Sequence, residues 1–180
     1  MLQIEIEGKE YWDEGKEEFV TTPGTILRLE HSLKSLREWE SKWKKPFLHQ
    51  KDMTLEELID YIRCMTIGPP KDQLTYMSIT GDQLAQIKDY MNDSMTATTF
   101  RAEEDGPKNR SITTAEILYY EMSELNIPYS CERWNLNQLL ALIRVCAIKR
   151  APKKKGKGGN AANNRKNLNK QRRNQYGTHG

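Results

Sequence analysis

The C-terminal end of the sequence sets the strongest limit on what the chain can fold into. From residue 149 onward there are eleven lysine or arginine residues, no aspartate or glutamate, and only Leu168 and Tyr176 as large apolar residues. Such a segment cannot bury enough apolar surface to offset the entropy lost when its backbone is ordered. We therefore predict a folded domain over residues 1–150 and a disordered basic arm over residues 151–180. A short helix at about 163–174 is expected when the arm is bound to a partner.

Charge divides the chain at the same point. The whole sequence has 28 basic and 25 acidic residues. Residues 1–148 therefore hold 17 basic and 25 acidic residues, a net charge of −8, whereas the remainder carries +11. The arm is expected to contact a polyanion such as nucleic acid, or an acidic protein surface. The residues proposed for this contact are Lys153, Lys154, Lys155, Lys157, Arg165, Lys166, Arg172 and Arg173.

The first 30 residues alternate between apolar and polar side chains, which is typical of strands with one buried face. This pattern occurs in LQIEIEG and again in TILRLE, and EEFV offers a short return strand between them. The KEYWDEG stretch and Thr22-Pro23-Gly24 are interpreted as turns. We predict a small antiparallel hairpin or sheet over about residues 2–30.

The remainder of the domain has the 3.6-residue periodicity of amphipathic helices. Capping boxes are predicted at Ser35–Glu38, Thr54–Glu57, Thr80–Gln83 and Thr113–Glu116. The stretch that ends in Asp105-Gly106-Pro107 reads as a loop, and the last two helices as a helical hairpin. The fold class is therefore α+β and mostly α, with about five helices. They are expected at about residues 33–45, 55–66, 82–92, 114–125 and 134–147.

Side chains with catalytic or metal-binding potential are sparse. His31, His49 and His179 match no zinc spacing, and the sequence has no phosphate loop or nucleophile motif. The three cysteines are widely spaced among apolar residues, as expected for small core residues in a reducing compartment. The acidic N-terminal stretch is unlike a signal peptide, and no apolar run approaches the roughly 20 residues of a membrane span. We expect an intracellular protein that is not an enzyme and needs no cofactor or metal.

Large aromatic residues cluster on three of the predicted helices. They could pack in the core or anchor a partner protein. Because Tyr119 and Tyr120 are adjacent on one helix, one of them must be substantially exposed. The candidate partner-binding residues are Tyr119, Tyr120, Met122, Trp134, Trp39 and Trp43.

Three long blocks of the sequence are distinctive: LRLEHSLKSLREWESKWKKPFL (27–48), LIDYIRCMT (58–66) with SMTATTF (94–100), and ITTAEILYYEMSELNIPYSCERWNLNQLLALIRVC (112–146). They resemble the tail assembly chaperones of long-tailed phages of Gram-positive hosts, small proteins that are encoded just before the tape measure gene. The ending NLNKQRRNQYGTHG also resembles the arginine-rich end of that family. The residue that follows Tyr120, Glu121, replaces an aromatic residue in the usual pattern.

The resemblance implies a late, non-enzymatic protein that coats the tape measure protein and keeps it soluble before the tail tube polymerises. Binding would place apolar helices in grooves. The tail tube protein would be a further partner, and the chaperone would self-associate along its client. It would act in the host cytoplasm and be absent from the mature virion.

Two other functions remain open from the sequence. The same small fold would serve a structural virion protein of the tail or of head completion. The basic arm would also serve a nucleic-acid-binding regulator, although base-stacking aromatic residues are missing from it except Tyr176. Incidental nucleic acid affinity at low salt is expected in any case.

Overall fold

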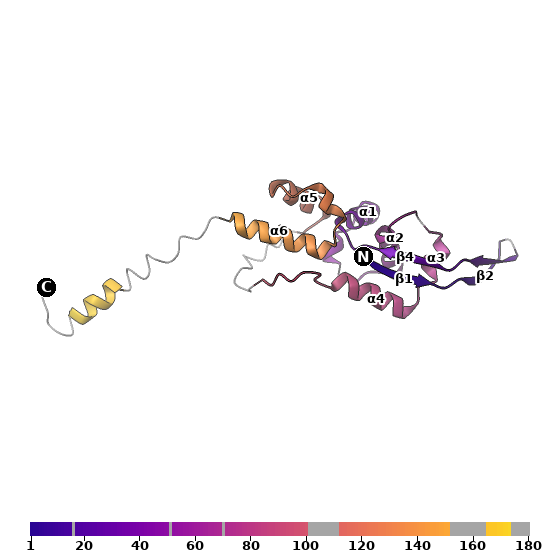
Figure 1. Ribbon diagram of the computed structural model, residues 1–180, viewed down its shortest axis with the longest axis horizontal. Helices are drawn as coiled ribbons and strands as arrows, with labels where there is room; N and C mark the ends of the chain where they lie inside the picture. The colour runs from indigo at the N-terminus through magenta and orange to yellow at the C-terminus, as the bar shows by residue number, and fades with distance from the viewer. Residues whose placement is uncertain (16, 51, 70, 101–111, 152–164, 174–180) are drawn as a thin grey trace. The chain divides into compact units, whose positions relative to one another are not determined.

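The structure is a computed structural model that describes residues 1–15, 17–50, 52–69, 71–100, 112–151 and 165–173 (Figure 1). The chain divides into two compact units, Met1–Ile148 and Lys149–Gly180. The first unit has the predicted α+β fold, mostly α, with a small antiparallel β element at its N-terminal end. No helix in the described part of the chain is long and apolar enough to cross a membrane.

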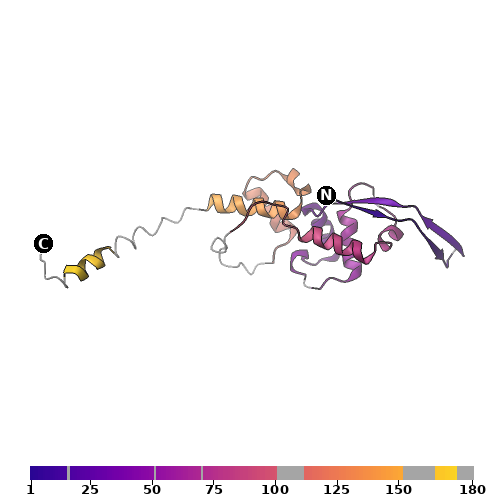
Figure 2. The ribbon, with the colours of Figure 1, turned by 60° about the horizontal axis from the view of Figure 1, so that its bottom comes forward.

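Four strands form one long antiparallel hairpin that is interrupted half-way. Strand β1 (Leu2–Ile6) pairs with β4 (Thr25–Leu29), with Leu2 opposite Leu29, and β2 (Lys9–Asp13) pairs with β3 (Glu18–Thr22). The two pairs separate at Gly8 and Pro23-Gly24, where proline lacks the N–H that a continuous ladder needs. Figure 2 shows the β2–β3 ribbon bending away from the β1–β4 pair at this point.

The prediction that KEYWDEG forms a turn was wrong for most of its length, because Lys9–Asp13 is strand β2. Tyr11 lies opposite Val20 and Trp12 opposite Phe19. Aromatic and β-branched residues in such cross-strand pairs favour the extended backbone. The turn is confined to the residues between the strands, and it includes Glu17, whose φ of 51° is left-handed.

The β1–β4 pair buries one face, as the alternation predicted. Ile4, Ile6, Leu27 and Leu29 are each at most 3% exposed. The free edge of β4 is paired by the chain at the end of helix α2 (Leu55–Met65). There the N–H of Glu30 donates to the carbonyl of Met65 (2.9 Å), and the N–H of Ile67 donates to that of Arg28 (2.7 Å).

The five predicted helices of the domain are present. The short helix α3 was not predicted because its five residues are too few to show a period. The 3₁₀ turns η1 and η3 were not predicted either. The elements are α1 (Leu33–Trp43), η1 (Phe47–His49), α2 (Leu55–Met65), α3 (Gln73–Met77), α4 (Gly81–Asn92), α5 (Ala115–Glu124), η3 (Tyr129–Arg133) and α6 (Leu136–Arg150).

The helix caps match the sequence at two of the four predicted sites. Thr54 and Thr80 cap α2 and α4 through capping boxes with Glu57 and Gln83. At α1 the box is formed three residues earlier than predicted, by Ser32 and Ser35. At α5 the N-cap residue Thr114 makes no side-chain capping bond, so the predicted box is absent there. The buried carboxylate of Glu40 in α1 accepts a hydrogen bond from the N-terminus of α5 in its place.

The predicted basic arm lies within the second unit. Residues 165–173 form a helix in which every residue is exposed. This helix falls inside the range 163–174, in which a short helix was predicted only for the arm bound to a partner. The predicted disorder of residues 152–164 and 174–180 concerns positions outside the described residues.

Candidate partner-binding groove between α5 and α6

Glu40 of α1 positions the N-terminus of α5. Its side chain is buried, and Oε2 accepts a hydrogen bond from the N–H of Ala115 at 2.7 Å. The other oxygen, Oε1, accepts from the N–H of Phe47 at 2.8 Å. One carboxylate therefore satisfies the first helical N–H group of α5 and the first of η1, and it fixes both elements to α1. The negative charge also suits the N-terminal end of a helix dipole.

Helix α6 is anchored at its own N-terminus to the junction between β4 and α1. The N–H of Leu136 donates to the carbonyl of His31 at 2.7 Å. The side chain of Asn135 accepts from the N–H of Asn137 at 3.0 Å, as an N-cap residue does. The start of α6 is thus fixed to the centre of the domain.

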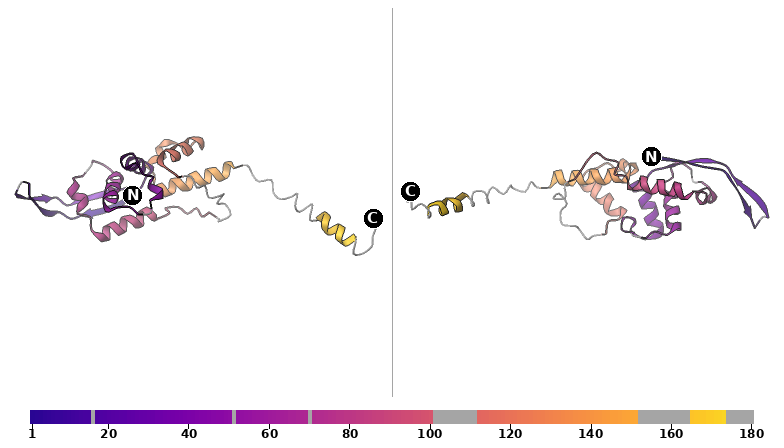
Figure 3. Two further views of the ribbon diagram at one scale, coloured as in Figure 1. Left: turned by 180° about the vertical axis from the view of Figure 1, so that it is seen from behind. Right: turned by 90° about the horizontal axis from the view of Figure 1, so that it is seen from below.

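The prediction that the last two helices form a helical hairpin was wrong, because α5 and α6 do not pack tightly on each other. The backbone of α5 lies close to α1 instead, and the two helices extend from the body separately (Figure 3). A groove of about 470 Å³ lies between them. Its lining is mainly apolar, with charged side chains among it. The lining residues are Thr113, Leu118, Tyr120, Glu121, Glu124, Leu125, Leu140, Ile143, Arg144 and Ala147.

Helix α6 has apolar residues on all sides, whereas a helix on the surface of a domain has one apolar face. Its sequence from Leu139 to Ile148 is LLALIRVCAI. Only Leu136, Leu139 and Ile143 of this helix are buried. Leu140, Leu142, Val145 and Cys146 are partly exposed, and Ala147 is exposed. Part of the apolar surface of α6 therefore remains uncovered by the described residues.

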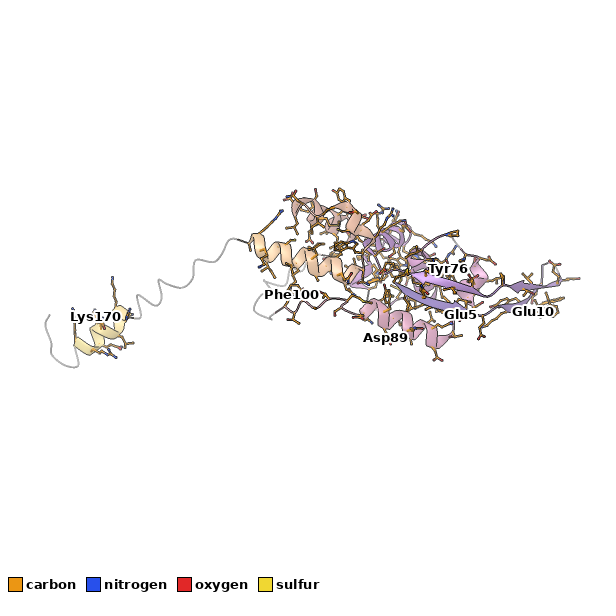
Figure 4. All side chains as sticks on the ribbon, in the orientation of Figure 1. Glu5, Glu10, Tyr76, Asp89, Phe100 and Lys170 are labelled. Carbon is orange, nitrogen blue, oxygen red and sulfur yellow. The ribbon has the colours of Figure 1, made fainter. Side chains whose placement is uncertain are left out.

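The segment after α4 covers another part of α6. Gln138 Nε2 donates to the carbonyl of Met95 at 2.8 Å. The guanidinium of Arg144 lies 4.0 Å from the ring centroid of Phe100, which Figure 4 shows beside α6. These contacts fix Arg144 along one side of the groove. The loop predicted at 92–110 continues past Phe100 into residues 101–110, which lie outside the described residues.

Of the predicted anchors, Tyr120 lines the groove. Its side chain is 64% exposed, which confirms that one member of the tyrosine pair is exposed. Tyr119 is half-buried on another side of α5, where its hydroxyl donates to Glu132 Oε2 at 2.6 Å. Burial and this hydrogen bond raise the pKa of Tyr119. Tyr119 therefore helps to fasten α5 to η3.

Three predicted anchors have structural roles instead. Met122 and Trp39 are fully buried and belong to the core, so neither presents a surface to a partner. The indole of Trp39 donates to the carbonyl of Glu57 at 2.9 Å, and that of Trp43 donates to Asp60 Oδ2 at 2.8 Å. The two indoles stack at 6.1 Å between centroids. They join α1 to α2.

Trp134 is 48% exposed but does not line the groove. It borders a smaller hollow of about 390 Å³ with Tyr90, Met95 and Gln138. The structure thus brings only one of the six predicted residues, Tyr120, into the groove. Three of the other lining residues, Leu140, Ile143 and Ala147, are aliphatic side chains of α6. Their only signal in the sequence is that α6 has more apolar residues than one buried face requires.

The predicted basic contacts are partly described. Arg165, Lys166, Arg172 and Arg173 are exposed on the helix over residues 165–173. Lys153, Lys154, Lys155 and Lys157 lie outside the described residues.

The described residues contain no cluster of three or more potential metal ligands. Cys64, Cys131 and Cys146 are free thiols. Burial raises the pKa of Cys64 to about 11, which leaves it protonated and unreactive near neutral pH. The groove therefore offers apolar surface and a few charges.

Comparisons with protein-family models, with curated proteins and with solved structures gave no match.

Proposed function

We propose that this protein is a phage tail assembly chaperone that holds apolar helical segments of the tape measure protein in the α5–α6 groove. The observation that carries the proposal is the incompletely buried α6, which is apolar on all sides. The partly exposed apolar side chains of such a helix offer a surface that a partner can cover. The resemblance of residues 27–48, 58–66 and 112–146 to the chaperone family supports the choice of partner.

The groove suits one face of an amphipathic helix. Tyr120, Leu125 and Leu140 supply exposed apolar surface from both walls. The buried side chains of Leu118 and Ile143 form the floor beneath them. Such a surface receives the i, i+3, i+4 and i+7 side chains of a bound helix. A tape measure protein is a long, helix-rich chain that would aggregate if its apolar faces stayed open. Shielding these faces is therefore the chemistry that the groove can supply.

The charged lining residues can orient the bound helix. Glu121 lies in the groove, and burial raises the pKa of its carboxyl group. A cation on the client would offset the cost of keeping that carboxylate desolvated. The proposed client segment therefore has an apolar stripe with a lysine or arginine beside it.

The proposed function also implies where and when the protein acts. The chaperone would act in the host cytoplasm while tails are assembled. Tail tube subunits would displace it from the client, so the mature virion would lack it.

We predict that Ala147→Glu abolishes client binding without unfolding the protein. Ala147 is exposed and lines the groove, so a glutamate is tolerated in the free protein. A client helix would bury the new carboxylate away from water among apolar side chains, at a cost of about 1–3 kcal/mol or more. The expected result is at least a tenfold loss of co-purified tape measure protein on co-expression. Soluble client is expected to fall with it.

The matched control is Ala85→Glu, the same change at an exposed alanine of α4. This variant should retain wild-type recovery of soluble client. Equal recovery with both variants would show that the groove does not bind the client. Abundant protein in purified mature particles would instead identify a structural virion component.

A further inference from the structure

The outer face of the β2–β3 ribbon carries an exposed aromatic pair, Trp12 and Phe19. Trp12 is 53% and Phe19 70% exposed, and their rings meet edge to face at 5.0 Å. The opposite face of the ribbon contacts the body, since the Tyr11 hydroxyl bonds to the side chain of Ser78. The aromatic pair therefore faces away from the domain. An exposed pair of large aromatic rings is typical of a binding surface.

The same ribbon is strongly acidic. Residues 9–22 include five acidic residues and two lysines. Glu10 precedes Trp12 by two positions and so lies on the same face of the ribbon (Figure 4). Glu14, Glu17 and Glu18 are exposed at the tip. Acidic side chains around aromatic faces attract cations through charge and through the ring quadrupole. The surface therefore selects a cationic partner with an apolar side chain at its centre.

The helix over residues 165–173 has this chemistry. Its sequence, RKNLNKQRR, has five cations and no acidic residue, and all nine residues are exposed. Leu168 is its one large apolar side chain and is 50% exposed. Arg165 and Arg172 stand three residues before and four residues after Leu168, so the three share one helix face. Leu168 can cover the aromatic pair while the guanidinium groups meet the ribbon carboxylates.

We infer that the aromatic, acidic face of the β2–β3 ribbon binds the basic helix at residues 165–173 of a second copy of this chain. Within Met1–Ile148 the ribbon and the C-terminal end of α6 lie at opposite ends in every view (Figures 1, 2 and 3). Since α6 leads into the basic segment, contact between two molecules needs no fold-back of the chain. Such a contact joins two different surfaces and is heterologous. Repeated from copy to copy, it produces an open linear array instead of a closed dimer. The inference is independent of the client and of the α5–α6 groove.

Sedimentation velocity of the full-length protein, freed of nucleic acid, tests this inference. The wild-type protein should form species larger than dimers as concentration rises, and tenfold more salt should shift it toward monomer. Two charge-reversal variants each alter one of the two contacting surfaces. Glu10→Lys/Glu14→Lys alters the ribbon, and Arg165→Glu/Arg172→Glu alters the helix. Each variant alone should associate at least tenfold more weakly than the wild-type protein.

The decisive measurement is the equimolar mixture of the two variants. The ribbon variant keeps an intact basic helix, and the helix variant keeps an intact ribbon. The unaltered surfaces can form one contact, and the reversed charges of the two altered surfaces are complementary as well. The mixture should therefore recover the association that each variant lacks alone, and this recovery also shows that both variants are folded. The matched control, Glu38→Lys/Asp89→Lys, makes the same charge change at exposed positions of α1 and α4 and should associate like the wild-type protein.

Three results would overturn the inference. A wild-type protein that stays monomeric at every concentration excludes the contact between copies. A mixture that stays monomeric while each variant is folded shows that the ribbon and the helix do not bind each other. Equal weakening in the control shows that net charge, and not this surface, governs association.

Discussion

Replacing Glu40 by alanine is expected to destabilise the folded domain by about 4 kcal/mol. The substitution removes the acceptor for two N–H groups, those of Phe47 and Ala115, and both residues are buried. Hydrogen bonds to a charged acceptor contribute roughly 1.5–3 kcal/mol each, and a buried donor without a partner loses this and its hydration. The effect should appear as a lower midpoint in urea with an unchanged slope.

Two further variants define the origin of the effect. Glu40→Gln keeps one carbonyl oxygen and directs its amide group at the other donor, so about half of the loss is expected. Glu38→Ala lies two residues away, is exposed and makes only an i,i+4 pair with Lys34 at 3.8 Å. Its expected change is within about 0.5 kcal/mol. A Glu40→Ala protein as stable as Glu38→Ala would show that the carboxylate does not hold α5 and η1.

The second large effect is a loss of stability in mild acid caused by His31. Its ring is 4% exposed and shares a hydrogen bond of 2.6 Å with the Tyr61 hydroxyl. Burial lowers the pKa of His31 to about 4, and the nearby Glu30 opposes this only in part. The unfolded chain, with a histidine pKa of about 6.5, therefore binds a proton before the folded one does. The stability that the folded domain gains from keeping His31 uncharged is fully present above pH 6.5. It is lost as the pH falls toward 4.

The expected loss from this residue between pH 7.5 and pH 4 is about 3 kcal/mol, since each unit of pKa difference corresponds to about 1.4 kcal/mol. The measurement is the free energy of unfolding at both pH values for the wild-type protein and for His31→Asn. Asparagine cannot titrate, but it can offer an oxygen near the position of Nδ1. Carboxylates that titrate near pH 4 act equally in both proteins, so the difference in pH dependence isolates His31. Identical pH dependence in the two proteins would exclude this role.

The sequence predicted the elements that have a strong local signal. The period-two segments became β1 and β4, and the boxes at Thr54 and Thr80 mark the starts of α2 and α4. Where a long-range partner replaced a local signal, the prediction was wrong. The N-terminus of α5 is held by Glu40, which is 75 residues away in the chain. Strand β2 was missed because its stability depends on the cross-strand partners Val20 and Phe19.

The candidate groove was less predictable than the fold. Aromatic residues were predicted to anchor a partner protein. Instead, Trp39 and Trp43 use their indole N–H groups to join α1 to α2. Whether such a side chain is buried depends on which helix faces which, and the sequence period does not encode this. The groove exists because α5 packs on α1 and diverges from α6. Only the excess of apolar residues in α6 signalled it.

The bond between Leu136 and His31 has a consequence for the order of folding. It joins the end of the β-hairpin region to the start of the last helix, across more than a hundred residues of chain. The entropy of closing so long a loop must be lost before the contact contributes, which makes such folding slow. During synthesis from the N-terminus, the hairpin and α1 emerge long before α6. Part of the apolar surface of the nascent hairpin region therefore stays exposed until nearly the whole domain has been synthesised.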